Sequence, residues 1–303
     1  MKFHAATLRS FGGNSSHYQK AWVAFHIGNG AGPGMAHHGG VPTVTSQAPV
    51  DPFRAPARKE AGGRTQSHFL MKLTLRPADE RGAANHGWLD SRFSFSFAEY
   101  HDPRHMGFRT LRVINDDYVA PGAGFPTHPH RDMEIFSYVL EGAIAHRDSM
   151  GNGRQLLPGQ IQLMSAGSGV THSEFNPSQT ERLHLLQIWI FPEKRGLTPS
   201  YTEWHPKPEH RDDPKVLVIS ADGRDGSATI HQDADIYRLL LAAGQTVTHD
   251  VRAGRGAWVQ IAKGGLTLNG QALQTGDGAS TDDTGTLTFT ATEPTEAILF
   301  DLK

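Results

Sequence analysis

The chain contains no cysteine, which excludes disulfides, cysteine-ligated zinc, iron–sulfur clusters and thiol nucleophiles. It also lacks any apolar run near the ~18 residues that a membrane-spanning helix needs. Its formal net charge is only −2, so no overall basic field exists that would hold a nucleic-acid backbone or an anionic membrane. We therefore expect no direct nucleic-acid binding and no membrane insertion.

Glycine, proline and histidine are abundant instead. The 33 glycines and 18 prolines are typical of a turn-rich β protein, and the 18 histidines of a cysteine-free chain point to imidazole chemistry. The first residues, MKFHAATLRSFGGNSS, do not place an apolar stretch soon after a basic start, as a secretory signal does. We expect a cytoplasmic protein, and a monomer.

The first 70 residues differ in composition from the rest. They hold ten glycines, five prolines, seven Lys or Arg and two acidic residues, a net charge of +5, whereas residues 71–303 have a net charge of −7. Their one apolar run (AWVAFHI) is interrupted by His26 and is too isolated to build a core. We interpret residues 1–70 as a disordered extension, or as upstream sequence translated from a misassigned start at Met1 instead of Met71.

From Met71 onward, short β-rich runs recur between Gly, Pro, Asn and Asp, and long helical periodicity is absent. Many short strands at regular spacing predict an all-β protein built of sandwiches or barrels. A Pro- and charge-rich stretch divides the runs into two groups, so we predict a first domain at 71–204, a linker at 205–214 and a second domain at 215–303. The runs are 93–97, 110–114, 134–140, 160–164, 184–191, 216–219, 228–231, 235–242, 258–262, 265–268, 286–290 and 297–302.

Two His-containing pairs carry the most chemical information. His128 and His130 are separated by one residue, and so are His172 and Glu174. Residues i and i+2 of a strand face the same side, so two adjacent strands could close three imidazoles and one carboxylate around a divalent cation. Nitrogen and oxygen ligands without sulfur suit Fe(II), Mn, Co, Ni, Cu(II) or Zn. Four protein ligands on a six-coordinate metal would leave two positions for a substrate and O2.

The glycine-framed contexts of these pairs resemble the two motifs of the cupins. Gly122-x5-His128-x-His130-x3-Glu134 fits the first motif, and Gly159-x7-Gly167-x-Gly169-x2-His172-x3-Asn176 resembles the second. More narrowly, residues 71–303 resemble the pirin family, a bicupin group that includes bacterial quercetin 2,3-dioxygenases. The segments that carry the resemblance include NHGWLDS (85–91), FSFAEYHDP (95–103), HRDSMGN (146–152), MSAGSGVTHSEFN (164–176), LHLLQIWI (183–190) and DGRDGSATIHQDADIY (222–237).

The resemblance implies two cupin barrels and a specific ligand set. Pirins bind metal through the two histidines of the first motif together with the histidine and glutamate of the second, which here are His128, His130, His172 and Glu174. Fe(II) is the metal that the family implies. Glu134, a ligand in other cupins, shares strand parity with His130; it could face the cavity as a partner of the ligands or as a proton carrier, or lie exposed at the barrel rim.

The second half resembles a cupin that has lost its metal. His249 occupies the place of the first motif-one histidine, but Val251 stands in the place of the second, and no histidine follows between 279 and 302. We therefore expect His249 to be a structural or surface residue. His231, in a family-typical stretch, is also interpreted as structural.

The function that the resemblance implies is a mononuclear metal dioxygenase that cleaves flavonols such as quercetin with O2 and releases carbon monoxide. Glu174 or Glu134 would accept the proton of the substrate hydroxyl. Phe125, Phe136 or Trp189 could line the pocket, although each could equally belong to the core. The alternative is an iron-binding, redox-sensing regulatory pirin that acts through protein partners.

Overall fold

The computed structural model describes residues 71–303, so the prediction for residues 1–70 lies outside the described residues. The described part is built of β-strands and three short 3-10 helices: η1 (Ala78–Glu80), η2 (Pro208–His210) and η3 (Arg224–Gly226). No helix in residues 71–303 is long and apolar enough to cross a membrane.

The first barrel consists of a seven-stranded sheet and a four-stranded sheet packed face to face. In spatial order, the seven strands are β12 (Ser200–Trp204), β9 (Ile161–Ser165), β6 (Glu134–Glu141), β11 (Leu183–Ile190), β4 (Leu111–Val119), β3 (Leu89–Phe93) and β2 (Gly82–Asn85). The four strands are β5 (Gly124–His130), β10 (Val170–Phe175), β7 (Ile144–Asp148) and β8 (Gly153–Leu156).

The second barrel repeats this arrangement. Its seven-stranded sheet has the order β1 (Thr74–Arg76), β20 (Gly278–Thr281), β17 (Gly256–Lys263), β22 (Thr295–Leu302), β15 (Ala234–Leu241), β13 (Lys215–Ser220) and β14 (Ala228–Thr229). Its four-stranded sheet contains β16 (Thr246–Val251), β21 (Gly285–Ala291), β18 (Gly265–Leu268) and β19 (Gln271–Gln274). Residues 71–303 are thus all-β and form two cupin barrels, as the resemblance implied.

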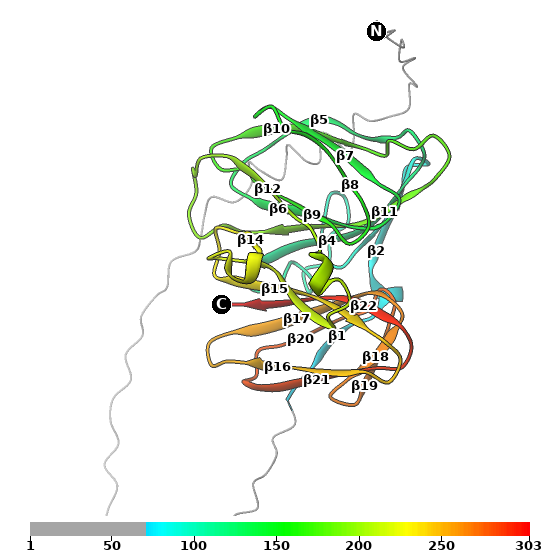
Figure 1. Cartoon of the computed structure of the whole chain (residues 1–303), viewed down its shortest axis with the longest axis vertical. Helices are drawn as coiled ribbons and strands as arrows, with labels where there is room; N and C mark the ends of the chain where they lie inside the picture. The colour runs from blue at the N-terminus through cyan, green and yellow to red at the C-terminus, as the bar shows by residue number, and fades with distance from the viewer. Residues whose placement is uncertain (1–70) are drawn as a thin grey trace, which may run out of the picture.

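The two seven-stranded sheets face each other in the middle of the molecule, and the four-stranded sheets lie at its two ends (Figure 1). A continuous apolar core fills this junction, with members such as Phe136, Ile188, Ile236 and Phe300. Every second residue of β6 and β11 therefore points toward the second barrel, and the residues between them point into the first barrel. This alternation decides which side chains can reach the candidate metal site.

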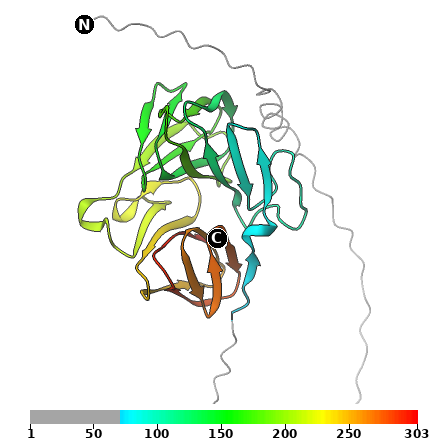
Figure 2. The ribbon, with the colours of Figure 1, turned by 90° about the vertical axis from the view of Figure 1, so that its right-hand side faces the viewer.

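The first described strand crosses between the barrels. The sequence analysis placed residues 74–76 with the first unit, whereas β1 pairs antiparallel with β20 at the edge of the second barrel's sheet. Figure 2 shows this segment at the start of the coloured ribbon, running beside the second barrel before the chain enters the first. The first barrel fills the matching edge of its own sheet with β12, which pairs with β9.

The strand predicted at 93–97 does not form. β3 ends at Phe93, and the Phe-Ser alternation that follows is buried on both sides. The hydroxyl of Ser94 bonds to Gln260 of the second barrel, and that of Ser96 bonds to the loop at Asp102. Alternation normally indicates a half-buried strand, but here the serines are satisfied by buried partners instead of by water.

Candidate metal centre

Strands β5 and β10 bring three histidines together. The two strands are antiparallel and adjacent, and His172 lies directly opposite His128. His128 and His130 alternate along β5, so all three imidazoles point into the barrel, where they are 6%, 2% and 2% exposed. Their ring centroids lie 4.5–4.8 Å apart, and one nitrogen from each ring lies within 4.8 Å of the others.

A β-bulge in β5 helps to orient the first of these rings. His172 pairs with His128 and Glu174 pairs with Phe125, so an advance of two residues along β10 corresponds to three residues along β5. The extra residue turns the carbonyl of Pro126 toward His128, whose Nδ1 donates to it over 2.7 Å. A neutral imidazole that donates through Nδ1 keeps its lone pair on Nε2, which is the form that binds a metal.

Burial disfavours the charged form of two of these imidazoles. It lowers the pKa of His128 from 6.5 to about 4 and holds the pKa of His172 well below 6.5, because a buried ring is poorly solvated when charged. The edge of the cluster is apolar: the indole of Trp189 meets His130 edge to face at 5.1 Å. Neutral nitrogens in a dry cavity are ready to coordinate a cation without first losing a proton.

Glu174 lies deeper in the barrel, against the inner face of the seven-stranded sheet. Its Oε1 accepts hydrogen bonds from the hydroxyl of Ser137, at 3.1 Å, and from the amide of Gln162. Its Oε2 accepts one from the amide of Gln187 at 2.7 Å. Burial raises the pKa of Glu174, although the three donors favour its charged form. A carboxylate has about four lone-pair positions, so Oε2 keeps one for a cation or a proton.

The donor set fits a divalent metal ion. The Nε2 atom of His172 is buried and has no hydrogen-bond partner among residues 71–303, which would be costly unless a ligand normally occupied it. His172 belongs to two overlapping groups of candidate ligands, one with His128 and His130 and one with His146 and Glu174. The structure thus places the four predicted ligands in two overlapping groups that share His172, and their assignment as ligands stays a prediction.

Glu134 lies elsewhere. It shares the outward-facing side of β6 with Phe136, on the opposite face from Ser137. Its Oε1 accepts from the hydroxyl of Ser165 at 2.7 Å, and its Oε2 lies 3.4 Å from Nδ1 of His231 in the second barrel. Glu134 and His130 are an even number of residues apart, which would place them on one face of a continuous strand. A turn between β5 and β6 moves the chain to the other sheet, so the two side chains do not share a face. Neither Glu134 nor Phe136 faces the metal cavity.

His146 is the functional candidate that the sequence analysis missed. It lies on β7 opposite Glu174, and its side chain is fully buried. Its Nδ1 atom is 3.5 Å from Nδ1 of His172, and its Nε2 is 3.1 Å from Oδ2 of Asp148. The spacing His146-x-Asp148, in the segment HRDSMGN (146–152), repeats the i, i+2 signal of the other pairs and could have indicated it.

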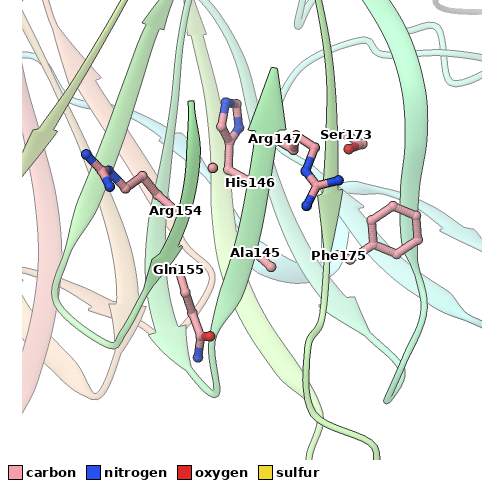
Figure 3. Close-up of a pocket in the computed structure, with 8 residues that line it drawn as sticks. Ala145, His146, Arg147, Arg154, Gln155, Ser173 and Phe175 are labelled. Carbon is pink, nitrogen blue, oxygen red and sulfur yellow. The ribbon is translucent and has the colours of Figure 1, made fainter. Parts of the chain in front are cut away.

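A surface pocket of about 510 Å³ adjoins this part of the barrel (Figure 3). Several of its lining residues, such as Arg147, Ser173 and Phe175, alternate along β7 and β10 with buried ones. Figure 3 shows the side chains of Arg147 and His146 on either side of β7. Most of this pocket therefore lies outside the sheet, and we do not assign it to the metal cavity.

Comparison with known proteins defines the class to which the two barrels and their buried histidines belong. A family model described as Pirin matches residues 74–190, and one described as the quercetinase C-terminal cupin domain matches residues 217–302. The chain belongs to the pirin family of bicupins.

Particular relatives then narrow the comparison. The chain is 52% identical to a quercetin 2,3-dioxygenase of Escherichia coli K12 over 233 residues, which is 76% of this chain and 98% of that protein. It is 44% identical to a putative quercetin 2,3-dioxygenase of Pseudomonas aeruginosa, over 76% of this chain and 99% of that one. The crystal structure of the E. coli pirin YhhW in complex with nickel(II) is similar, with a TM-score of 0.73 and 51% identity, covering 76% of this chain and 99% of that one.

Proposed function

We propose that this protein is a mononuclear metal-dependent dioxygenase that cleaves flavonols such as quercetin with O2 and releases carbon monoxide. The observation that carries the proposal is the buried group of three imidazoles beside a buried carboxylate, in a chain 52% identical to a quercetin 2,3-dioxygenase. Nitrogen and oxygen donors of this kind bind first-row divalent metals.

His128, His130, His172 and Glu174 would hold the metal. We propose Fe(II) as the native ion on the strength of the family, while the nickel complex of YhhW supports binding of other first-row ions. A bound divalent metal would supply positive charge that lowers the pKa of a substrate hydroxyl and stabilises the resulting enolate.

Glu174 is the proposed proton acceptor. Three donors fix its carboxylate in one orientation, and the single remaining lone pair, on Oε2, would serve the metal or the proton of a substrate hydroxyl, one at a time. Burial raises the pKa of Glu174, and the charge of a bound divalent metal would act in the opposite direction.

The surrounding side chains keep the reaction dry and favour an aromatic substrate. Trp189 packs on His130, and Phe125 lies 6.5 Å from His128 between ring centroids. Both aromatic side chains are buried, at 1% and 6% exposure, so they exclude water from the imidazoles. A flat flavonol ring would find apolar walls beside the polar centre.

The test is an anaerobic metal loading followed by reaction with quercetin. Protein loaded with one equivalent of Fe(II) should consume O2 and quercetin in equal amounts and release carbon monoxide, and metal-free protein should do neither. If fully loaded protein takes up no O2 with quercetin or related flavonols, the dioxygenase assignment is wrong. The metal centre would survive that result, and the iron-binding regulatory function would become the better interpretation.

A further inference from the structure

The candidate ligand His172 has a hydrogen-bonding neighbour, His146, that is not among the four predicted ligands. His146 and Asp148 lie on β7, which pairs antiparallel with β10. In this register Asp148 lies opposite His172, and His146 lies opposite Glu174. The ring of His146 stacks on Tyr201 from β12, with centroids 4.8 Å apart and an angle of 27° between the planes. This packing holds the imidazole in one plane between Asp148 and His172.

Asp148 is locked into a single arrangement by its own turn. Its Oδ1 accepts two backbone N–H groups, from Met150 at 2.9 Å and from Asn152 at 3.0 Å. Its Oδ2 accepts the side-chain amide of Asn152 at 2.8 Å and faces Nε2 of His146 at 3.1 Å. An ionised carboxylate only accepts hydrogen bonds, so Nε2 of His146 must carry the proton between them.

The direction of the next contact then follows. An imidazole whose single proton lies on Nε2 has a lone pair on Nδ1, and in His146 this atom faces Nδ1 of His172 at 3.5 Å. For the two nitrogens to form a hydrogen bond, His172 must donate through Nδ1 and keep its lone pair on Nε2. That Nε2 atom is the buried one with no hydrogen-bond partner among the described residues.

We propose that Asp148 and His146 form a relay of hydrogen bonds that fixes the tautomer and orientation of His172, so that its Nε2 faces the metal. The inference rests on the proposed metal centre and adds two positioning residues to it. Carboxylate–histidine–metal triads are common in metalloproteins, and here an additional imidazole lies between the carboxylate and the ligand. His128 reaches the same tautomer by a shorter route, through the carbonyl of Pro126.

His146 could instead be a ligand itself, since it forms a candidate group with His172 and Glu174. The contacts favour the relay, because both of its nitrogens are engaged: Nε2 with Asp148 and Nδ1 with His172. A ligand would need one nitrogen directed at the metal. The two roles also differ in what a substitution of Asp148 would do.

Asp148→Asn reverses the relay while preserving its shape. The two backbone donors require an oxygen at the Oδ1 position, so the new amide group must point toward Nε2 of His146. The side chain of Asn152, which donates to Oδ2 in the unsubstituted protein, must then turn its amide oxygen toward the new amide group. Nε2 of His146 then accepts a hydrogen bond, and the proton of His146 moves to Nδ1. Nδ1 of His172 must accept a hydrogen bond from that Nδ1, so His172 carries its own proton on Nε2. The wrong tautomer faces the metal, as happens when the triad aspartate of a serine protease becomes asparagine.

The experiment measures the affinity of the full chain for Ni(II) and the visible spectrum of bound Co(II), with the melting temperature of metal-free protein as a folding check. We expect Asp148→Asn and His146→Phe, which keeps a ring against Tyr201, each to weaken Ni(II) binding about 10–100-fold and to change the Co(II) spectrum. The double variant should bind Ni(II) no more weakly than the single variant with the lower affinity, because both substitutions act through the same hydrogen bonds. Asp301→Asn, the same change beside the buried His249 of the second barrel, is the matched control and should leave affinity unchanged.

Each alternative result contradicts the relay. Unchanged affinity and spectrum in Asp148→Asn would show that the carboxylate does not act on the metal site. Loss of all binding in His146→Phe with little effect of Asp148→Asn would make His146 a ligand. Effects that multiply in the double variant would indicate two independent roles. If unsubstituted protein bound no metal, the proposed metal centre would be wrong, and the relay with it.

Discussion

The two barrels share one arrangement of strands but differ in what fills them. The four-stranded sheets have the orders β5-β10-β7-β8 and β16-β21-β18-β19, so β5 and β10 correspond to β16 and β21. His128 faces His172 in the first barrel, and His249 faces Leu287 in the second. The positions of His130 and Glu174 correspond to Val251 and Phe289. Val251, Leu287 and Phe289 all belong to an apolar core.

The surviving histidine of the second barrel shows why residue type alone does not make a site. Lys215 lies 3.0 Å from Nδ1 of His249, and a lysine ammonium can only donate, so Nε2 of His249 donates in turn to Asp301 at 3.0 Å. Asp301 also accepts from Arg255. Both nitrogens of His249 are thus engaged in a charged network. This agrees with the expectation that His249 is structural, and it contrasts with the buried, unpartnered Nε2 of His172 within the described residues.

The largest expected effect is on catalysis, in Glu174→Gln, which changes a proposed ligand that is also the proposed base. Removing the charge and the proposed base should lower the rate of quercetin cleavage about 10²–10⁴-fold. The matched control is Glu134→Gln, an equally buried carboxylate that contacts Ser165 and His231 away from the cavity, and its rate should remain near that of the unsubstituted protein. Rates are compared at equal metal content. If both variants lost the same fraction of the rate, Glu174 would have no special role in catalysis.

A second effect concerns Asp117, a carboxyl group inside the metal-binding barrel. Burial raises its pKa from 3.8 to about 7, although the hydroxyl of Ser91 donates to it. Between about pH 4 and pH 7 the unfolded chain ionises this group while the folded chain keeps its proton, so its contribution to stability falls as pH rises through that range.

Asp117→Asn has no such proton to lose. Its stability relative to the unsubstituted chain should therefore increase by about 1–4 kcal/mol between pH 4 and pH 8. Urea unfolding of metal-free protein at a series of pH values measures this difference. A difference that did not change with pH would show that Asp117 titrates normally in the folded protein.

The smallest effect is expected from removing residues 1–70. Every described strand lies between Thr74 and Leu302, and the match to the E. coli relative covers 98% of that protein with 233 residues of this chain. A chain that begins at Met71 should keep its metal affinity, and its stability should change by less than about 1 kcal/mol, or roughly 2–4 °C in Tm. Aggregation or a larger loss of Tm would assign a structural role to the removed segment.

Strand periodicity predicted the parts of the site that depend on i, i+2 geometry. His128 with His130, and His172 with Glu174, share faces as expected. Features that depend on the path between strands could not be predicted. The turn before β6 sends Glu134 to the junction, the bulge in β5 brings the carbonyl of Pro126 to His128, and the fold carries β1 to the other barrel.

His146 illustrates a different limit. Its spacing to Asp148 was visible in the sequence, but the pairing of β7 with β10, which sets it beside His172, is a long-range contact. A local pattern shows which residues share a face of one strand. It does not show which strand lies next to it, and the neighbouring strand decides whether a buried histidine is a ligand, a support for a ligand or part of a charged network.

The central claim is that one barrel binds a metal and the other does not. It is tested most directly by titrating metal-free protein anaerobically with Fe(II) and measuring bound metal per chain in the unsubstituted protein, in His172→Ala and in His249→Ala. We expect one equivalent, none and one equivalent, respectively. A full equivalent of tightly bound metal in His172→Ala, or its loss in His249→Ala, would contradict the account.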